Sequence, residues 1–171
     1  MQPNQPEGYL AVPSTDKSNA VLVLHPWWGL NNTIKAVCDR LAEAGFVAFV
    51  PDLYHGKVTD QIAEADVLSR KVFQDITPTQ ADVKHAADFL NEYVGGDGLA
   101  VMGFSFGAFF ALDLSVAAPE IVHSVVVFYG ARPGDYSKSK ASYLGHFAEV
   151  DEFEPQEGID ELAADLKRAG R

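Results

Sequence analysis

The sequence predicts an α/β domain of three layers, in which helices cover both faces of a mostly parallel central sheet. Two short runs, residues 21–25 (VLVLH) and 46–50 (FVAFV), are almost entirely apolar, which is the pattern of strands buried on both faces. Between them, residues 33–44 repeat apolar side chains at the spacing of one helix face, and Gly45 ends that pattern. Strands that alternate with amphipathic helices indicate parallel strands joined by right-handed crossovers.

The remaining elements follow from the same periodicities and from turn residues. Pro51 halts the second run, and Thr77 and Pro78 are typical of the N-cap and first residue of a helix. Gly95 and Gly96 end that helix. The expected strands span residues 8–12, 21–25, 46–50, 99–104, 124–129 and 143–147, and the expected helices span residues 33–44, 60–74, 77–94, 107–117 and 155–169.

The composition is that of one globular domain spanning residues 1–171, with 47% hydrophobic and 22% charged residues. A formal net charge of −11 argues against nucleic acid and anionic membranes as partners, since both attract basic surfaces. The single cysteine, Cys38, excludes an internal disulfide framework and suits a reducing compartment, so we expect a cytoplasmic protein. We expect no signal peptide and no membrane span, because no apolar run approaches the ~20 residues that a span needs.

The most informative segment is residues 99–108 (LAVMGFSFGA), where an apolar strand leads through a tight turn into a helix. Gly103, Ser105 and Gly107 form the G-x-S-x-G pattern in the setting that gives it meaning, a serine nucleophile on a strand–turn–helix elbow. Strained backbone angles lift the serine Oγ clear of the sheet edge. The flanking glycines are needed because a Cβ there would make the strand and the helix collide.

Other chemically informative residues fall at the same edge of the predicted sheet. They are residues 25–29 (HPWWG), 51–54 (PDLY), 129–130 (YG) and Asp151, all beyond the carboxyl ends of strands, where the sites of parallel sheets lie. Their convergence predicts one site. We expect it to need no metal and no cofactor, because the sequence shows neither metal-ligand spacing nor a glycine-rich phosphate loop.

Several segments taken together resemble the dienelactone hydrolase family of α/β-hydrolases. They are residues 24–56 (LHPWWGLNNTIKAVCDRLAEAGFVAFVPDLYHG), 103–108 (GFSFGA), 126–130 (VVFYG) and 145–155 (GHFAEVDEFEP), and the match runs from about Tyr9 to the last residue. The resemblance implies the three-layer α/β-hydrolase fold with a mostly parallel central sheet. It also implies that this chain lacks the family's last strand and last helix, with the missing strand beside residues 143–147.

The resemblance assigns roles to individual positions. Ser105 is the nucleophile, and Asp151 is the acid that orients a histidine and stabilises its charged form. The backbone N–H groups of Phe106 and Trp27 hold the oxyanion. In the loop after the first buried strand, Trp27 is the donor because Pro26 has no N–H. The resemblance and the loop positions also place three residues at the substrate pocket, namely Trp28, Tyr54 and His55.

Two departures from well-known members of the family concern the nucleophile. Those members use a cysteine where this chain has Ser105, and they carry a glutamate where this chain has Pro26. In those members the glutamate acts on the thiolate of the cysteine nucleophile, so its absence here fits a serine enzyme.

The third departure concerns the base. The triad of this fold follows the chain order serine, acid, histidine, and none of the five histidines follows Asp151. His25 and His146 border the expected site, yet we expect both to be hydrogen-bonded structural residues, since a general base must come within roughly 3 Å of the serine Oγ.

The sequence therefore predicts a serine hydrolase that cleaves small esters or lactones by a Ser-His-Asp mechanism, with the histidine outside these residues. We expect the 171-residue form to be nearly inactive as an esterase. We also expect it to associate through the uncovered sheet edge at residues 143–147, as a homodimer or with reduced solubility. The competing class is a catalytically inactive α/β-hydrolase-fold protein kept for binding or assembly.

Overall fold

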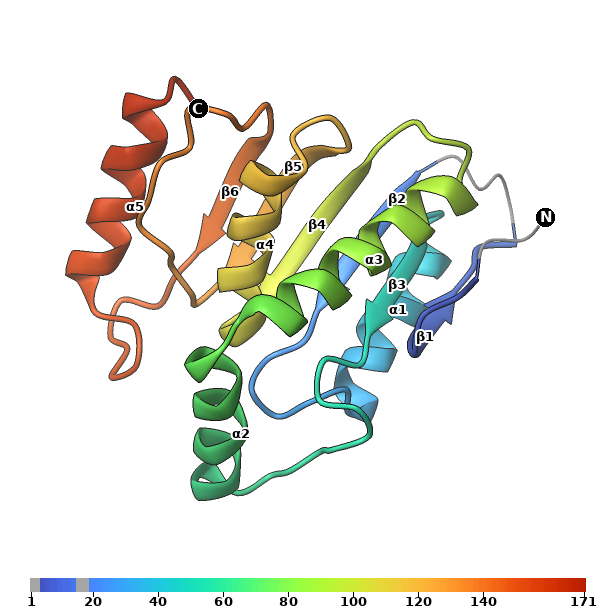
Figure 1. The fold of residues 1–171 in the computed structure, drawn as a ribbon, viewed down its shortest axis with the longest axis horizontal. Coiled ribbons are helices and arrows are strands. Elements are labelled where there is room, and N and C mark those ends of the chain that lie inside the picture. Colours follow the sequence, from blue (N-terminus) through green and yellow to red (C-terminus); the bar gives the residue numbers. More distant parts are fainter. Residues whose placement is uncertain (1–3, 15–18) are drawn as a thin grey trace.

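A computed structural model describes residues 4–14 and 19–171 of the chain (Figure 1). The strands are β1 (Gly8–Ala11), β2 (Ala20–Leu24), β3 (Val47–Pro51), β4 (Leu99–Phe104), β5 (Val122–Phe128) and β6 (Ser142–His146). The helices are α1 (Asn32–Glu43), α2 (Ile62–Gln74), α3 (Thr77–Tyr93), α4 (Phe106–Ala117) and α5 (Gln156–Arg168). Each expected strand and helix is present in the expected order. In the described residues, no helix is long and apolar enough to cross a bilayer.

The strands form one sheet in the order β1-β3-β2-β4-β5-β6. β1 pairs antiparallel with β3, and the remaining neighbours pair in parallel. The expected edge strands are thereby confirmed, β1 at one side and β6 at the other. Because β2 to β6 run in one direction, their carboxyl ends meet at the edge where β4 leads into α4 (Figure 1).

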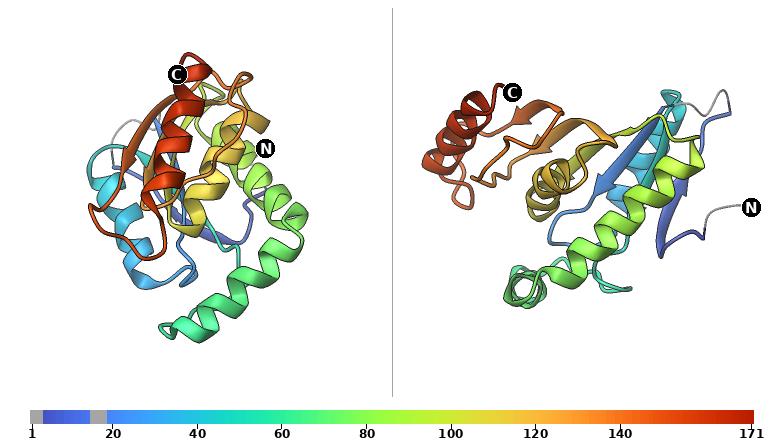
Figure 2. Two further views of the ribbon diagram at one scale, coloured as in Figure 1. Left: turned by 90° about the vertical axis from the view of Figure 1, so that its left-hand side faces the viewer. Right: turned by 45° about the horizontal axis from the view of Figure 1, so that its top comes forward.

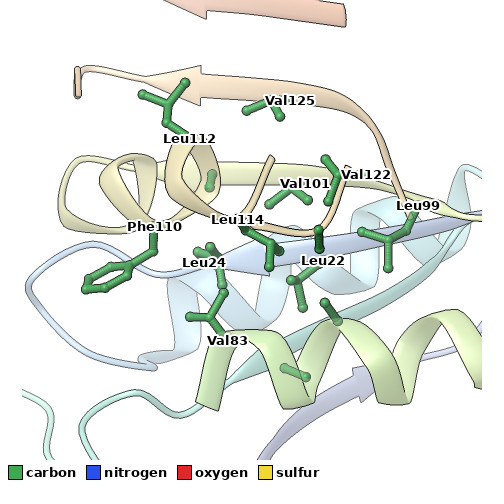
Figure 3. Packing of buried hydrophobic residues seen from close by; sticks show 14 of the residues in the cluster. Leu22, Leu24, Val83, Leu99, Val101, Phe110, Leu112, Leu114, Val122 and Val125 are labelled. Atoms are coloured by element: carbon green, nitrogen blue, oxygen red, sulfur yellow. The ribbon is translucent and has the colours of Figure 1, made fainter. Parts of the chain in front are cut away.

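Helices α3 and α4 lie on one face of the sheet and α1 lies on the other, which confirms the three-layer fold (Figure 2). The larger core joins the sheet to α3 and α4, where Leu24, Val101 and Phe110 are almost completely buried (Figure 3). The smaller core joins the sheet to α1 through Val23 and Cys38, both fully buried. Each apolar side chain of this size contributes about 1.5–3 kcal/mol on burial.

The face that carries α1 is shielded over one half and partly exposed over the other. Met102 and Phe104 of β4 are half-buried there, and Phe128 of β5 stacks on Phe104 with ring centroids 4.9 Å apart. His146 of β6 extends the stack, 4.7 Å from Phe128, and Leu144 is 54% exposed. The β4–β6 half of this face is therefore a partly exposed, largely apolar surface.

Two helix starts differ from the expected positions. α3 begins with Thr77 itself and has Ile76 as its N-cap residue, so the expectation that Thr77 is the N-cap is wrong. The carboxylate of Asp75 accepts the Thr77 N–H at 3.1 Å, which supplies from two residues upstream the oxygen that a capping threonine would have provided. α4 begins at Phe106, directly after Ser105, one residue earlier than expected.

Candidate active site

Ser105 occupies a strained turn between β4 and α4. Its φ of +50° and ψ of −114° lie in a region that a residue with a side chain rarely adopts. The turn is held in place by the Ser105 N–H, which donates to the carbonyl of Phe128 at 2.9 Å, and by the Ser105 carbonyl, which accepts the N–H of Ala108 at 2.8 Å. The expected strand–turn–helix elbow is thus present, and it is anchored to the neighbouring strand β5.

Three glycines make room for this elbow, each against main-chain atoms. A Cβ at Gly103 would lie 2.6 Å from the Ala108 Cα and from the Gly107 carbonyl oxygen, which is the strand–helix collision expected from the motif. A Cβ at Gly107 would instead lie 2.2 Å from the carbonyl oxygen of Leu24, at the end of β2. A Cβ at Gly130, after β5, would lie 2.6 Å from the Ser105 carbonyl oxygen. The elbow is therefore enclosed by backbone on three sides.

The two expected oxyanion donors lie close to the serine. Phe106 is the first residue of α4, so its N–H has no acceptor within the helix. Trp27 lies in the turn after β2, and both residues line the cavity at Ser105. The structure thus brings Ser105, Phe106 and Trp27 to the wall of one cavity, and their role as an oxyanion hole stays a prediction.

A cavity of about 210 Å³ opens beside Ser105. Six segments form its wall: the elbow, the turn after β2, one side of α2, the start of α4, the loop after β5 and the loop after β6. Its lining residues are Trp27, Ser69, Phe73, Ser105, Phe106, Phe109, Gly130, Ala131 and Glu154. Ser69 and Phe73 were not expected from the sequence, although their i, i+4 spacing places them on one face of α2.

The loop after β6 places Glu154, rather than Asp151, in the wall of this cavity. Asp151 is half-buried, and its Oδ1 accepts the N–H groups of Phe153 at 2.8 Å and of Glu154 at 3.2 Å. This turn directs the Glu154 carboxylate to the N–H of Ala131, which it accepts at 2.8 Å. The expected role of Asp151 as the acid of the triad stays a prediction.

His25 is fully buried at the end of β2, and both of its ring nitrogens are engaged. Nε2 accepts the N–H of Leu53 at 3.1 Å, so the ring proton resides on Nδ1, which donates to the Pro26 carbonyl at 2.8 Å. Burial lowers the pKa of the imidazole, which keeps it neutral. His25 joins the loop after β2 to the loop after β3, as expected of a structural residue, and has no nitrogen free for Ser105.

The other histidines also lie away from the cavity. His146 stacks on Phe128 at the sheet edge, His123 packs against Gly98, and His85 belongs to α3. None of the five histidines, all of which the structure describes, lines the cavity at Ser105. Within residues 4–14 and 19–171, no three histidine, cysteine or carboxylate side chains gather closely enough to hold a metal ion.

Tyr54 and His55 line a different cavity, of about 420 Å³, between the loop after β3 and helices α2 and α3. His55 is exposed, with its ring 3.5 Å from a carboxylate oxygen of Asp82 and 3.6 Å from one of Glu7. The structure therefore does not bring either residue to the wall of the Ser105 cavity, and their contact with substrate stays a prediction.

Aromatic rings from the walls of the two cavities pack against each other. The Tyr54 ring packs against Phe106, with centroids 5.3 Å apart, and its buried hydroxyl has no partner among the described residues. Trp28 packs edge-on against Trp27 at 5.2 Å and does not line the Ser105 cavity. Its place in the substrate pocket is likewise a prediction.

Comparison with known proteins agrees with this geometry. The model of the dienelactone hydrolase family matches residues 7–171. "Protein usf" of Aquifex pyrophilus is 33% identical, and "Putative carboxymethylenebutenolidase" of Aquifex aeolicus is 31% identical. Each alignment covers 95% of this chain and 74% of the relative.

Solved structures show the same fold. The structure titled "m3DLH" is 25% identical with a TM-score of 0.85, over 95% of this chain and 71% of that one. A dienelactone hydrolase-like promiscuous phosphotriesterase from metagenomic libraries is 22% identical with a TM-score of 0.81, over 92% of this chain and 68% of that one. With a strained Ser105 between β4 and α4 and a family match over almost its whole length, the chain belongs to the dienelactone hydrolase family.

Proposed function

We propose that this protein is a serine hydrolase of the dienelactone hydrolase type that cleaves small esters or lactones. The observation that carries the proposal is Ser105, held at φ +50° in the wall of a cavity that Phe106 and Trp27 also line. Strain of this kind costs roughly 1–3 kcal/mol and persists where the surrounding structure requires it, typically at catalytic sites.

The proposed chemistry is acyl transfer through Ser105. The serine Oγ forms a bond to the carbonyl carbon while a base takes its proton, and the N–H groups of Phe106 and Trp27 stabilise the negative oxygen. The bond to the leaving alcohol then breaks, and the alcohol receives that proton. Water repeats the sequence on the acyl-serine, which releases the carboxylic acid and restores Ser105. Asp151 orients the histidine that serves as the base.

The small cavity supports a small substrate. A volume of about 210 Å³ lies below the 300–1,000 Å³ typical of pockets for drug-sized ligands. Relatives named for carboxymethylenebutenolide, a lactone, are in keeping with cyclic esters as a substrate class. We therefore place short-chain esters and lactones within the proposed range.

The test supplies the base that none of the five histidines provides. Without it, we expect p-nitrophenyl acetate turnover by the 171-residue chain to stay near the roughly 10³–10⁴-fold acceleration that binding and the oxyanion hole give alone. Added imidazole is expected to raise the rate above that of the Ser105→Ala variant at the same imidazole concentration. A longer form with a histidine after Asp151 is expected to turn over the ester without imidazole. Rates in the variant that equal those of the parent protein would exclude Ser105 from the mechanism.

A second candidate function is binding or assembly without catalysis. It is favoured by the absence of any imidazole among the described residues that line the Ser105 cavity. The reading frame beyond codon 171 separates the two candidates. A continuation that encodes a strand, a histidine and a helix favours the hydrolase, and a stop codon favours the binding protein.

We also propose that the chain self-associates through β6. This strand is a sheet edge with unpaired backbone groups, and its Leu144 side chain is 54% exposed. Light scattering on the purified chain is expected to give the mass of a dimer, and a monodisperse monomer would contradict the proposal.

A further inference from the structure

The peptide bond between Pro26 and Trp27 is held at its carbonyl by two donors. The Pro26 oxygen accepts the Nδ1–H of His25 at 2.8 Å and the main-chain N–H of Gly29 at 3.1 Å. The second bond closes a four-residue turn from Pro26 to Gly29, in which Gly29 has a φ of +83°. Two donors on one oxygen restrict the rotation of this peptide plane about its flanking bonds.

The same peptide carries the N–H of Trp27, one of the two expected oxyanion donors. The peptide bond is trans, so its N–H and its carbonyl point in opposite directions. Because the carbonyl is turned toward the buried His25 ring, the N–H is directed to the other side of the peptide. This N–H has no acceptor among the described residues, and Trp27 itself lines the Ser105 cavity. The Trp27 N–H is therefore available to an acceptor from outside the chain.

The other contacts of the His25 ring fix the ring itself. Its Nε2 accepts the N–H of Leu53 at 3.1 Å, which places the ring proton on Nδ1. The ring also stacks on Phe106, with centroids 6.1 Å apart and planes 14° from parallel, and Tyr54 packs edge-on against it at 5.1 Å. Phe106 carries the second expected oxyanion donor. One fully buried side chain thus contacts the segments of both expected donors.

We propose that His25 is a positioning residue for the oxyanion hole, because its Nδ1–H holds the Pro26 carbonyl toward the core and so presents the Trp27 N–H to the oxyanion. The proposal rests on the proposed function and assigns a role to a residue that touches neither the substrate nor Ser105. His25 and Pro26 are both buried, so water does not compete for this hydrogen bond. A donor that is fixed before the reaction stabilises the oxyanion without a cost of reorganisation.

The test compares two variants of the same shape. His25→Asn keeps an N–H donor at the position of Nδ1, whereas His25→Leu has the same branching and no donor. Both variants lose the acceptor for the Leu53 N–H, so any effect of loosening the loop after β3 is common to the two. A difference between them reports on the hydrogen bond to the Pro26 carbonyl alone.

The first readout is the rate at which Ser105 is acylated by p-nitrophenyl acetate and by its thionoester, with added imidazole as the base and the rate of Ser105→Ala subtracted. Sulfur accepts hydrogen bonds weakly, so the thionoester gains little from oxyanion donors. Loss of one such donor costs roughly 10²–10³-fold in rate. We expect the ester to react at least about tenfold more slowly with His25→Leu than with His25→Asn, and the thionoester rates to differ by less than about threefold. The same ratio of ester to thionoester rates in both variants would overturn the proposal.

The second readout is the amide order parameter of Trp27 from ¹⁵N relaxation, which does not depend on turnover. We expect about 0.85, the value of rigid backbone, in the parent protein and in His25→Asn, and a value below about 0.6 in His25→Leu. Equal order parameters in the two variants would overturn the proposal even where Ser105 is acylated. If the order parameters differ as expected and Ser105 is acylated in none of the proteins, the proposed function fails while the positioning of Trp27 by His25 stands.

Discussion

The elbow at Ser105 and the loop after β6 both contribute to the candidate site, yet they are held in place by different means. Backbone encloses the elbow, since a Cβ at Gly103, Gly107 or Gly130 would lie within 2.6 Å of main-chain atoms. The loop after β6 depends on two side-chain carboxylates, Asp151 and Glu154, and keeps Val150 and Phe153 85% and 72% exposed.

This difference shows which half of the site the fold fixes by itself. Ser105 and Phe106 belong to the packed junction of β4 and α4, so their positions are expected to change only if the core changes. The loop with the expected acid follows the edge strand β6 and depends on a few exposed or part-buried hydrogen bonds, each worth about 0.5–1.5 kcal/mol. The conformation of the loop that carries Asp151 is therefore expected to depend on the solution conditions and on what packs against the loop. The conformation of the elbow at Ser105 is not.

The largest effect is expected from Gly107→Ala. Its new Cβ would lie 2.2 Å from the Leu24 carbonyl oxygen, so the elbow or the end of β2 must shift. We expect the free energy of unfolding to fall by about 3 kcal/mol or more, measured by urea denaturation. Gly158→Ala in α5 is the control. Its Cβ meets only the end of the Glu154 side chain, and a helical Gly-to-Ala change is expected to be neutral or stabilising by up to about 1 kcal/mol. A mild effect at Gly107 would show that the elbow is not fixed by backbone contacts.

An intermediate effect is expected from pH through His25. Burial lowers its pKa below the value of 6.5 that it has when unfolded, so below about pH 6.5 the unfolded chain binds a proton that the folded chain does not. The contribution of His25 to stability is thus complete above pH 6.5 and is lost as the pH falls toward the lowered value, by up to about 1.4 kcal/mol per pH unit. His25→Gln is expected to flatten this part of the stability profile, measured by urea denaturation between pH 7.5 and 5. A variant profile with an unchanged slope would show that other groups cause the loss.

A smaller and local effect is expected from Asp151→Ala. The change removes the acceptor for the N–H groups of Phe153 and Glu154, at a cost of roughly 1–2 kcal/mol confined to the loop. Hydrogen exchange at these two amides should accelerate, while the amides of β4 keep their protection. Asp151→Asn retains an oxygen acceptor and should show less acceleration. Loss of protection throughout β4 would mean that the loop and the elbow form one cooperative unit, against the distinction drawn above.

The sequence predicts the elbow better than the loop for a physical reason. Apolar runs and helical periodicity define the sheet and α4, and G-x-S-x-G predicts the strained Ser105 because the backbone there leaves few alternatives. Glu154 reaches the cavity because its carboxylate accepts a hydrogen bond from the N–H of Ala131, which is 23 residues away in sequence. No local pattern encodes such a contact. The same applies to Phe73, whose place in the wall depends on how α2 lies against α4.

The positions of Tyr54 and His55 illustrate a related limit. Both follow a strand at the carboxyl edge of the sheet, which made them candidates for the substrate pocket. Hydrogen bonds fix the loop after β3. The Leu53 N–H donates to His25 Nε2, and the Asp52 carboxylate accepts the N–H groups of Tyr54 and Gly56. These contacts turn the loop toward a second cavity. The edge of the sheet is predictable from strand polarity, whereas the direction of each loop is not.

The most direct test of the central claim is whether Ser105 becomes acylated. The purified chain is incubated for hours with p-nitrophenyl acetate, and the acetylated positions are identified by peptide mapping, with Ser105→Ala as the control. Because deacylation needs the same base as acylation, the acetyl group should accumulate on Ser105 and be absent at this position in the variant. Acetylation of lysines alone, to the same extent in both proteins, would contradict the role of Ser105 as the nucleophile.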